Sequence, residues 1–218
     1  MSVEHVAQTR GIDSLYHFTT IENLFSILER GFVYSRNNID ALKLEDDGLF
    51  TADYVDHMDD QRLDGLLDYV NLSLSRPNWY LLQKFMKRPE LSHFDWCILK
   101  LDISPMFEPS TLFSVCNAAS NAAKRYGVAR GLSSFNALFQ EEIVATSVFK
   151  RNNTPNNFTT DIQAEILVKD AISINHINKV FLANEAKMKQ TESALRLLKL
   201  HVDKFEVNQP LFSGPILR

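Results

Sequence analysis

Cysteine and glycine are scarce in this sequence, and their scarcity removes several classes of protein. The 218 residues include 2 cysteines, Cys97 and Cys116, too few for a disulfide framework and without the paired spacing of a zinc site. The 7 glycines do not cluster, so the glycine-rich phosphate loops of P-loop and Rossmann proteins are absent. A G-x-S-x-G elbow and an H-E-x-x-H motif are absent as well. Most of the common enzyme classes are therefore disfavoured.

Long apolar runs and an excess of positive charge are also missing. No window reaches the length of a membrane-spanning helix, and residues 1–10 lack the apolar centre of a secretion signal. We therefore expect a soluble, cytoplasmic protein with reduced thiols and no membrane partner. The formal net charge is -4 and the pI about 5.9, whereas proteins that bind nucleic acid through bulk charge are basic. Any contact with nucleic acid must use a local patch.

The chain has the composition of an ordinary globular protein, with 45% hydrophobic and 23% charged residues. Its length fits one domain over residues 1–218. Several short strands occur with a few helices and without strict alternation, which favours an α+β fold. The expected strands cover residues 15–19, 68–75, 94–102, 111–115, 161–168, 179–182 and 202–207, and the expected helices lie within 21–28, 79–88, 117–123, 133–139 and 185–201.

In the stretch 161–168, the alternation of residues separates Glu165 from an apolar face. Ile162, Ala164, Ile166 and Val168 fall on one side of a period-two pattern, which predicts a strand. Glu165 then points away from the inward face, and we expect its carboxylate at the mouth of a cleft. The alternative is an ordinary strand acid in contact with water.

The best-defined local unit begins at residue 15. A β-prone aromatic segment places His17 and Thr19 on one face, and an amphipathic helix follows, ended by Gly31. Thr19 and Glu22 have the spacing of a capping box, which would give Thr19 a purely structural role. For His17, the alternative to a ligand is an ordinary, partly buried histidine.

Two further segments could contribute to function. Arg62 lies in a long polar region, 37–68, of the length that functional lids have. Four aspartates and a histidine of the same region do not match the spacing of a known metal site, so no metal is expected; they are Asp53, Asp56, His57, Asp59 and Asp60. The helix expected at 79–88 is either an ordinary amphipathic helix or a surface that stacks bases and pairs with phosphates of a single strand. The residues of that surface are Trp79, Tyr80, Lys84, Lys87 and Arg88.

Taken in order, five segments of the chain resemble the DarT family of DNA ADP-ribosyltransferase toxins. They are residues 15–28, 62–65, 69–73, 117–120 and 163–168, ending in Gln-Ala-Glu-Ile-Leu-Val. The resemblance implies a split mixed β-sheet with flanking helices and an NAD cleft between its halves. It also implies transfer of ADP-ribose from NAD, used as co-substrate, to a base of single-stranded DNA. Such toxins act in toxin–antitoxin or phage-defence systems, usually with a macrodomain antitoxin as partner.

The resemblance assigns roles by position. His17 and Thr19 match the motif that holds the nicotinamide-side ribose and the amide, and Asn23 would support the co-substrate. Arg62 matches the catalytic arginine and Glu165 the catalytic glutamate. A carboxylate beside the ribose would stabilise positive charge as the bond to nicotinamide breaks, and could accept a proton from the acceptor base. Two alternatives stay open: the same chemistry with RNA or a protein as acceptor, and a module that binds NAD or nucleic acid without catalysis.

Overall fold

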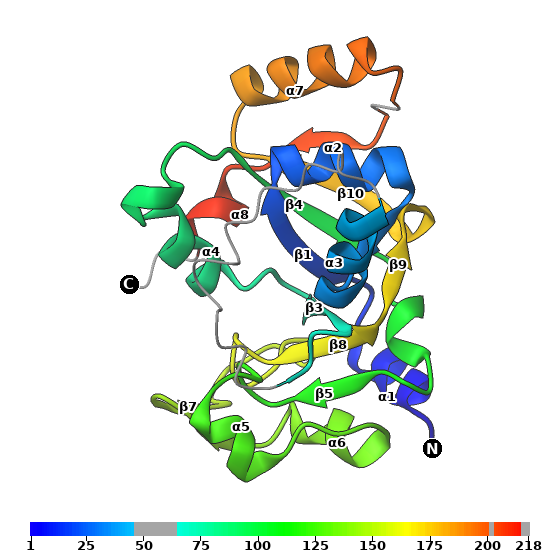
Figure 1. The fold of residues 1–218 in the computed structure, drawn as a ribbon. Coiled ribbons are helices and arrows are strands. Elements are labelled where there is room, and N and C mark those ends of the chain that lie inside the picture. Colours follow the sequence, from blue (N-terminus) through cyan, green and yellow to red (C-terminus); the bar gives the residue numbers. More distant parts are fainter. Residues whose placement is uncertain (46–64, 201–202, 215–218) are drawn as a thin grey trace.

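The structure is a computed structural model, and it describes residues 1–45, 65–200 and 203–214 (Figure 1). Its helices are α1 (Val3–Arg10), α2 (Ile21–Arg30), α3 (Arg36–Glu45), α4 (Trp79–Met86), α5 (Asn121–Tyr126), α6 (Leu132–Ala137), α7 (Glu185–Leu197) and α8 (Pro210–Ser213), with short 3-10 turns η1 (Pro89–Leu91), η2 (Ser104–Phe107) and η3 (Ile174–His176). Its strands are β1 (Leu15–Thr20), β2 (Phe32–Tyr34), β3 (Tyr69–Leu74), β4 (Trp96–Leu101), β5 (Leu112–Ser114), β6 (Glu142–Val144), β7 (Val148–Lys150), β8 (Glu165–Lys169), β9 (Ala171–Ser173), β10 (Ile177–Leu182) and β11 (Phe205–Val207).

One seven-stranded sheet organises the molecule, in the order β11-β10-β4-β1-β3-β8-β5. Strands β10 and β11 are parallel, whereas the other neighbours in this sheet are antiparallel. In Figure 1, β10, β4 and β1 lie in the upper part of the molecule and β8 and β5 in the lower part, with β3 between them. The mixed sheet with flanking helices confirms the expected α+β class.

The sheet is split between β1 and β3. Strand β1 pairs with β4 along all of its six residues, from Leu15↔Leu101 to Thr20↔Trp96. It pairs with β3 only at Leu15↔Leu74 and Tyr16↔Ser73. Beyond that point β3 pairs with β8 instead. The two halves of the sheet are therefore joined at one end and separate towards the carboxyl end of β1, as expected for a split sheet.

Both faces of the upper half are covered. Along β4, Cys97, Leu99 and Leu101 enter the main core, which α1 and α2 help to close. Trp96 and Ile98 point to the other face and pack with residues of α4 and α8. Helix α7 lies at the top of Figure 1, against β10 and β11. Cys97 and Cys116 are both buried and form no disulfide, as expected.

Most predicted elements are confirmed within a few residues, but the predicted strand 161–168 begins too early. In the structure β8 starts at Glu165 and residues 161–164 form a turn. The physical reason is the Asp161 carboxylate, whose Oδ1 accepts the N–H of Gln163 at 2.8 Å. A short acidic side chain that bonds the backbone two residues ahead favours a turn over a strand.

The predicted cap of α2 is also wrong by one residue. Thr20, not Thr19, is the N-cap, and its Oγ1 accepts the N–H of Asn23 at 3.3 Å. Gly31 ends the helix in the left-handed region, at φ 81, as its position in the sequence predicts. Thr19 therefore does not have the capping role that its spacing from Glu22 predicted.

We expect Thr20→Ala to lower the free energy of unfolding by about 1 kcal/mol, since that is the usual cost of a lost N-cap. Thr20→Ser keeps the capping oxygen and is the matched control. Urea unfolding of the two variants and the wild type measures the difference. Equal stability of Thr20→Ala and wild type would show that Thr20 does not cap α2.

Candidate functional site

His17 bridges the split in the sheet. Its Nδ1 lies 2.9 Å from the backbone carbonyl of Asn71 in β3, just beyond the last β1–β3 backbone pair, Tyr16↔Ser73. Because a carbonyl oxygen only accepts hydrogen bonds, Nδ1 carries the proton, and in the neutral ring Nε2 is then an acceptor. Burial lowers the pKa of His17, and the bond to the Asn71 carbonyl opposes that change in part. The imidazole is therefore neutral near pH 7.

Thr19 and Asn23 are brought together beside His17. Thr19 is buried, two residues along β1 from His17 and on the same face. Its Oγ1 accepts a hydrogen bond of 3.3 Å from Nδ2 of Asn23, in the first turn of α2. A hydroxyl can accept and donate at once, so Thr19 keeps a proton to donate. The strand and the helix that follows it thus gather three of the predicted residues.

Glu165 is the first residue of β8 and is 7% exposed. Its Oε2 accepts the backbone N–H of Ala118 at 2.9 Å. The segment before α5 is shaped to present that N–H, since the side chain of Asn117 accepts the N–H of Ala119 at 2.9 Å and Ser120 caps α5. The expectation that Glu165 does not simply point into water is confirmed. The carboxylate is held in one position by a neighbouring loop.

The sheet register relates Glu165 to His17. Strand β8 pairs with β3 as far as Leu72↔Ile166, so Glu165 is one step further, opposite Ser73. Ser73 in turn pairs with Tyr16, the residue before His17. Neighbouring strands are about 4.8 Å apart, so the backbone of Glu165 lies about 10 Å from β1, two strands away. The structure therefore places Glu165 and His17 at the same level of the sheet, where its halves separate.

Arg62 lies outside the described residues, as do the residues considered as a metal cluster, Asp53, Asp56, His57, Asp59 and Asp60. Within the described ranges, no group of three or more His, Cys, Asp or Glu side chains is arranged to hold a metal ion. The helices in those ranges are also too short or too polar to cross a membrane.

The predicted nucleic-acid surface falls on α4 and the two residues after it. Tyr80 is 49% exposed and Lys84 and Lys87 are exposed, at spacings that align them on one face of a helix. The Arg88 guanidinium lies over the ring of Phe85, 5.6 Å from its centroid. Trp79 is placed differently, because its ring lies directly against Gly214, the residue after α8. The approach is so close that a Cβ at position 214 would come within 2.6 Å of Trp79 Cδ2. Its indole packs at the α4–α8 contact, which leaves Tyr80 as the exposed ring.

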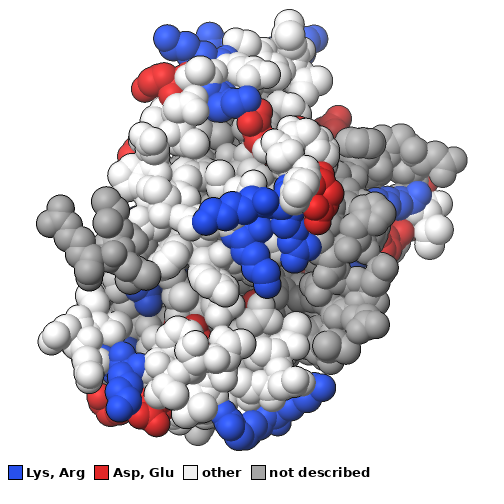
Figure 2. All heavy atoms as spheres, turned by 90° about the vertical axis from the view of Figure 1, so that its left-hand side faces the viewer, with Lys and Arg blue, Asp and Glu red and all other residues white. Residues whose placement is uncertain are grey.

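Figure 2 shows the face on which α4 lies. Lys and Arg side chains gather near the middle of this face, at the height of α4, although the whole chain has a net charge of -4. An acidic side chain adjoins this group on one side, and much of the other described surface near it is uncharged in this view. A local basic patch of this kind is what the acidic composition requires for any contact with nucleic acid.

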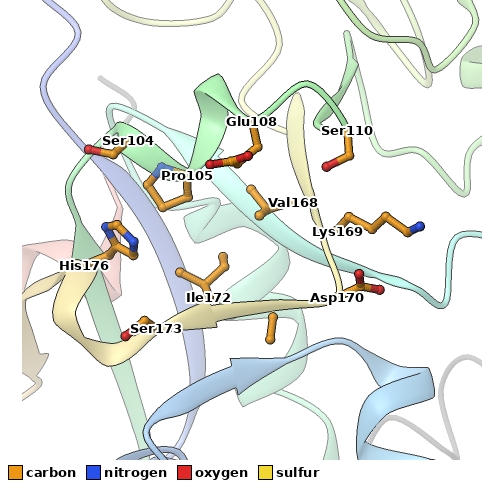
Figure 3. A pocket seen from close by; sticks show the side chains of 11 residues that line it. Ser104, Pro105, Glu108, Ser110, Val168, Lys169, Asp170, Ile172, Ser173 and His176 are labelled. Atoms are coloured by element: carbon orange, nitrogen blue, oxygen red, sulfur yellow. The ribbon is translucent and has the colours of Figure 1, made fainter.

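A cavity of about 420 Å³ lies at the opposite end of β8 from Glu165. The strand rises about 3.3 Å per residue, so its last residue, Lys169, is about 13 Å from Glu165. Figure 3 shows Glu108, Ser110 and His176 around this cavity, over Val168 and Ile172. None of the predicted site residues lines it. The cavity is therefore separate from the candidate site.

Sequence reasoning missed the groups that hold Glu165. The N–H of Ala118 could not be identified, because residues 117–123 were expected to be helical or tightly packed, whereas α5 begins at Asn121. Asp161 is fully buried, immediately before the turn that leads to Glu165. Burial raises the pKa of Asp161 to about 6, against the opposing effects of the Gln163 N–H and of Arg76. Asp161 is the first residue of the strand predicted over 161–168. An acid at the start of a predicted strand did not indicate that its side chain is buried at a turn.

Between them, these residues offer the groups that the ribose end of NAD requires. His17 presents an acceptor at Nε2, Thr19 a hydroxyl, and Glu165 a fixed negative charge. Ribose hydroxyls need acceptors, and a carboxamide needs a donor. A carboxylate stabilises positive charge that develops on a sugar when its glycosidic bond breaks. These residues fit a dinucleotide substrate, and the chemistry they can support is glycosyl transfer.

Comparison with known families supports this interpretation. The family model described as "ssDNA thymidine ADP-ribosyltransferase, DarT" matches residues 16–213. A comparison with curated proteins gives no match.

Solved structures with a similar fold are DarT and DarTG proteins. DarT of Thermus sp. 2.9 in complex with NAD+ has a TM-score of 0.59 at 15% sequence identity, over 91% of this chain and 96% of that one. The same Thermus protein in complex with ADP-ribosylated ssDNA has a TM-score of 0.59 at 14% identity, over 91% and 95% of the two chains. Thermosipho africanus DarTG in complex with ADP-ribose has a TM-score of 0.57 at 16% identity, over 93% of this chain and 51% of that one. At these identities, the similarity concerns the fold.

Proposed function

The chain belongs to the DarT family, and from this premise we propose that it transfers ADP-ribose from NAD to a thymidine of single-stranded DNA. The observation that carries the proposal is the family match over residues 16–213, which includes both the His17 strand and the Glu165 strand. The solved relatives that share the fold are complexes with NAD+ and with ADP-ribosylated ssDNA. The choice of thymidine as the acceptor nucleoside rests on the same family match.

In this proposal the chain's own residues bind and orient the substrates. His17 accepts a hydrogen bond from a ribose hydroxyl through Nε2, while Thr19 binds the carboxamide and Asn23 orients Thr19. NAD supplies the ADP-ribose group when its bond to nicotinamide breaks. Glu165 stabilises the positive charge at the ribose and takes a proton from the thymine ring nitrogen that attacks. Arg62 pairs with the pyrophosphate or holds the acceptor, a bidentate task that suits arginine.

A single-stranded acceptor follows from accessibility. The ring nitrogen of a thymine is hydrogen-bonded inside a duplex, so a protein reaches it only on an unpaired or flipped base. The basic patch on α4 would pair with phosphates, and Tyr80 would stack on a base. In the same proposal Trp79 supports this surface from the side of α8, and Arg88 extends its charge.

The proposal includes a biological setting. A bulky charged group on a template base blocks base pairing, so the protein acts in the cytoplasm as the toxin of a toxin–antitoxin or phage-defence pair. A macrodomain antitoxin is the partner that fits, because the product carries ADP-ribose. The similarity to a DarTG protein in complex with ADP-ribose supports this pairing. The whole chain, residues 1–218, would form one catalytic domain.

Mass spectrometry of oligonucleotides incubated with NAD and the protein tests the function. A single-stranded DNA that contains one thymidine should gain the mass of one ADP-ribose, and a matched oligonucleotide without thymidine should not. If only RNA or only a protein gains ADP-ribose, the reaction is the proposed one but the acceptor is not single-stranded DNA. If NAD binds but no acceptor gains mass, the chain is a binding module, and the proposal is wrong.

The α4 patch makes a separate prediction about DNA affinity. We expect Lys84→Gln with Lys87→Gln to weaken binding of a single-stranded oligonucleotide about tenfold and to lower the slope of log K against log salt by about 1.4, because two phosphate contacts are lost. Fluorescence anisotropy at several salt concentrations measures both quantities. Lys189→Gln with Arg196→Gln on α7 removes the same charge elsewhere and should change neither. Equal effects of the two pairs would mean that only net charge matters.

A further inference from the structure

The turn before Glu165 is built around Asp161. Its Oδ1 accepts the N–H of Gln163 at 2.8 Å, and its backbone carbonyl accepts the N–H of Ala164 at 3.1 Å and the hydroxyl of Thr159 at 2.7 Å. Strand β8 begins at the very next residue, Glu165. These bonds hold the backbone of Gln163 and Ala164, the two residues before Glu165, so the place of the Glu165 carboxylate depends on the place of Asp161.

Arg76 connects this turn to the other half of the sheet. Its guanidinium lies over the ring of Phe158, with Cζ 4.5 Å from the centroid, and donates to the carbonyl of Thr159 at 3.4 Å. Arg76 and Asp161 are close enough for each charge to shift the pKa of the other. Arg76 follows β3 by two residues, next to the Leu74↔Leu15 pair at which β3 joins β1.

The backbone that directs Arg76 towards the turn is unusual. Ser75, between β3 and Arg76, has φ 61, a left-handed conformation that serine seldom adopts and that costs about 1 kcal/mol or more. Its N–H is bonded to the carbonyl of Ser14 at 2.9 Å, immediately before β1. The strain is thus held in place by the junction of the two half-sheets.

This arrangement lowers the stability of the fold. Asp161 is fully buried, and its Oδ2 and the Nε of Arg76 are buried and have no hydrogen-bond partner among the described residues. A buried polar atom left in that state costs about 1–3 kcal/mol. Buried charge and backbone strain at one place, next to a predicted catalytic residue, are typical of positions kept for function and not for stability.

The loop that leads to the turn is also fixed from within. Arg151 donates to the carbonyls of Pro155, Asn156 and Phe158 at 2.8–3.2 Å. Its guanidinium also lies over the ring of Phe139, 5.4 Å from the centroid. Arg151 therefore holds the segment between β7 and Asp161, and the bonds of Asp161 continue this support up to Ala164, the residue before Glu165.

We propose that Asp161 is a positioning residue for the transfer reaction: through the Gln163 N–H and the charge of Arg76 it fixes the turn that places the Glu165 carboxylate relative to the His17 half of the sheet. This inference rests on the proposed function, because positioning has a meaning only if Glu165 acts in catalysis. Asp161 itself contacts no substrate, since it is fully buried.

The test compares Asp161→Ala and Asp161→Asn with the wild type. Alanine removes both contacts, whereas asparagine keeps an acceptor for Gln163 and loses the charge towards Arg76. We expect kcat of the transfer reaction to fall about 100-fold in Asp161→Ala and about 10-fold in Asp161→Asn, with KM for NAD within about 2-fold, because the loss concerns the transition state only. Hydrogen exchange at the amides of Gln163 and Ala164 should be faster than in the wild type, most in Asp161→Ala, which has no acceptor for Gln163, and less in Asp161→Asn.

Asp102 provides a matched control. Its Oδ1 accepts the N–H of Ser104 at 2.8 Å, the same contact two residues ahead, in the connection after β4. Asp102→Ala should leave kcat unchanged. If Asp161→Ala does not fold, Asp161→Asn decides the matter. Wild-type kcat and wild-type amide exchange in Asp161→Asn, or a loss that follows the fraction of unfolded protein, would overturn the positioning role. A wild type that transfers nothing to any acceptor would instead overturn the proposed function, and this inference with it.

Discussion

Replacing Glu165 by glutamine is expected to lower the rate of ADP-ribose transfer about 10³-fold, while NAD still binds. The reason is electrostatic, since the amide has the shape of the carboxylate but neither its charge nor its basicity. Loss of a charge that stabilises the transition state costs about 10²- to 10³-fold, and loss of a general base about 10²- to 10⁴-fold. Mass spectrometry of a single-stranded oligonucleotide with one thymidine, in a time course with NAD, measures the rate.

The fold should survive this substitution. The Glu165 carboxylate accepts the N–H of Ala118 through Oε2, and the residue has a further interaction. The amide oxygen of glutamine can still accept from Ala118. Glu108→Gln is the matched control, because Glu108 lines the cavity at the other end of β8. Its transfer rate should equal that of the wild type. A Glu165→Gln protein that transfers at the wild-type rate would remove Glu165 from the mechanism, and loss of activity in Glu108→Gln would point to that cavity instead.

The parts of the site that could be predicted from the sequence are those that local rules determine. Strand β1 with its alternating faces, helix α2 with its apolar stripe and the stop at Gly31 all depend on residues within a few positions of one another. They place His17, Thr19 and Asn23 correctly relative to each other. The aromatic and basic residues of α4 share a helix for the same reason.

Strand order and side-chain bonds account for what the sequence did not reveal. That His17 meets the carbonyl of Asn71 depends on β1 lying beside β3, a pairing between segments 54 positions apart. Strands β2 and β9 were not expected, because each has only three residues and exists through its partner. The early start predicted for β8 has the opposite cause, since Ile162 and Ala164 alternate as a strand would, but Asp161 bonds the backbone and makes a turn. Local patterns cannot reveal bonds of these kinds.

His17 should have two separable roles, and two substitutions distinguish them. In His17→Asn the side-chain amide occupies the place of Nδ1 and can still donate to the carbonyl of Asn71, but the acceptor at Nε2 is lost. In His17→Gln the amide reaches the place of Nε2, and the bond to Asn71 is lost. If Nε2 binds a ribose hydroxyl, His17→Asn should weaken NAD binding about 10- to 100-fold at nearly unchanged stability.

The bond to Asn71 should appear in the folding free energy instead. We expect His17→Gln to lower the free energy of unfolding by about 1 kcal/mol, because it removes the hydrogen bond that joins β1 to β3 where the backbone pairs end. NAD affinity, measured by isothermal titration calorimetry, should fall less than in His17→Asn. Equal NAD affinity in His17→Asn and wild type would exclude Nε2 as a ligand of the ribose.

The pH dependence of stability gives an independent check on the environment of His17. Burial lowers the pKa of His17 in the folded protein, so between that value and the ordinary pKa of about 6.5 the unfolded chain binds more protons. Stability from this residue is therefore complete above about pH 6.5 and is lost as the pH falls. His17→Asn has no such group, so its stability relative to the wild type should rise as the pH is lowered from about 8 to about 5, as measured by urea unfolding. A difference that stays constant with pH would mean that the imidazole is not desolvated, and the neutral acceptor at Nε2 on which the proposed binding of ribose depends would lose its physical basis.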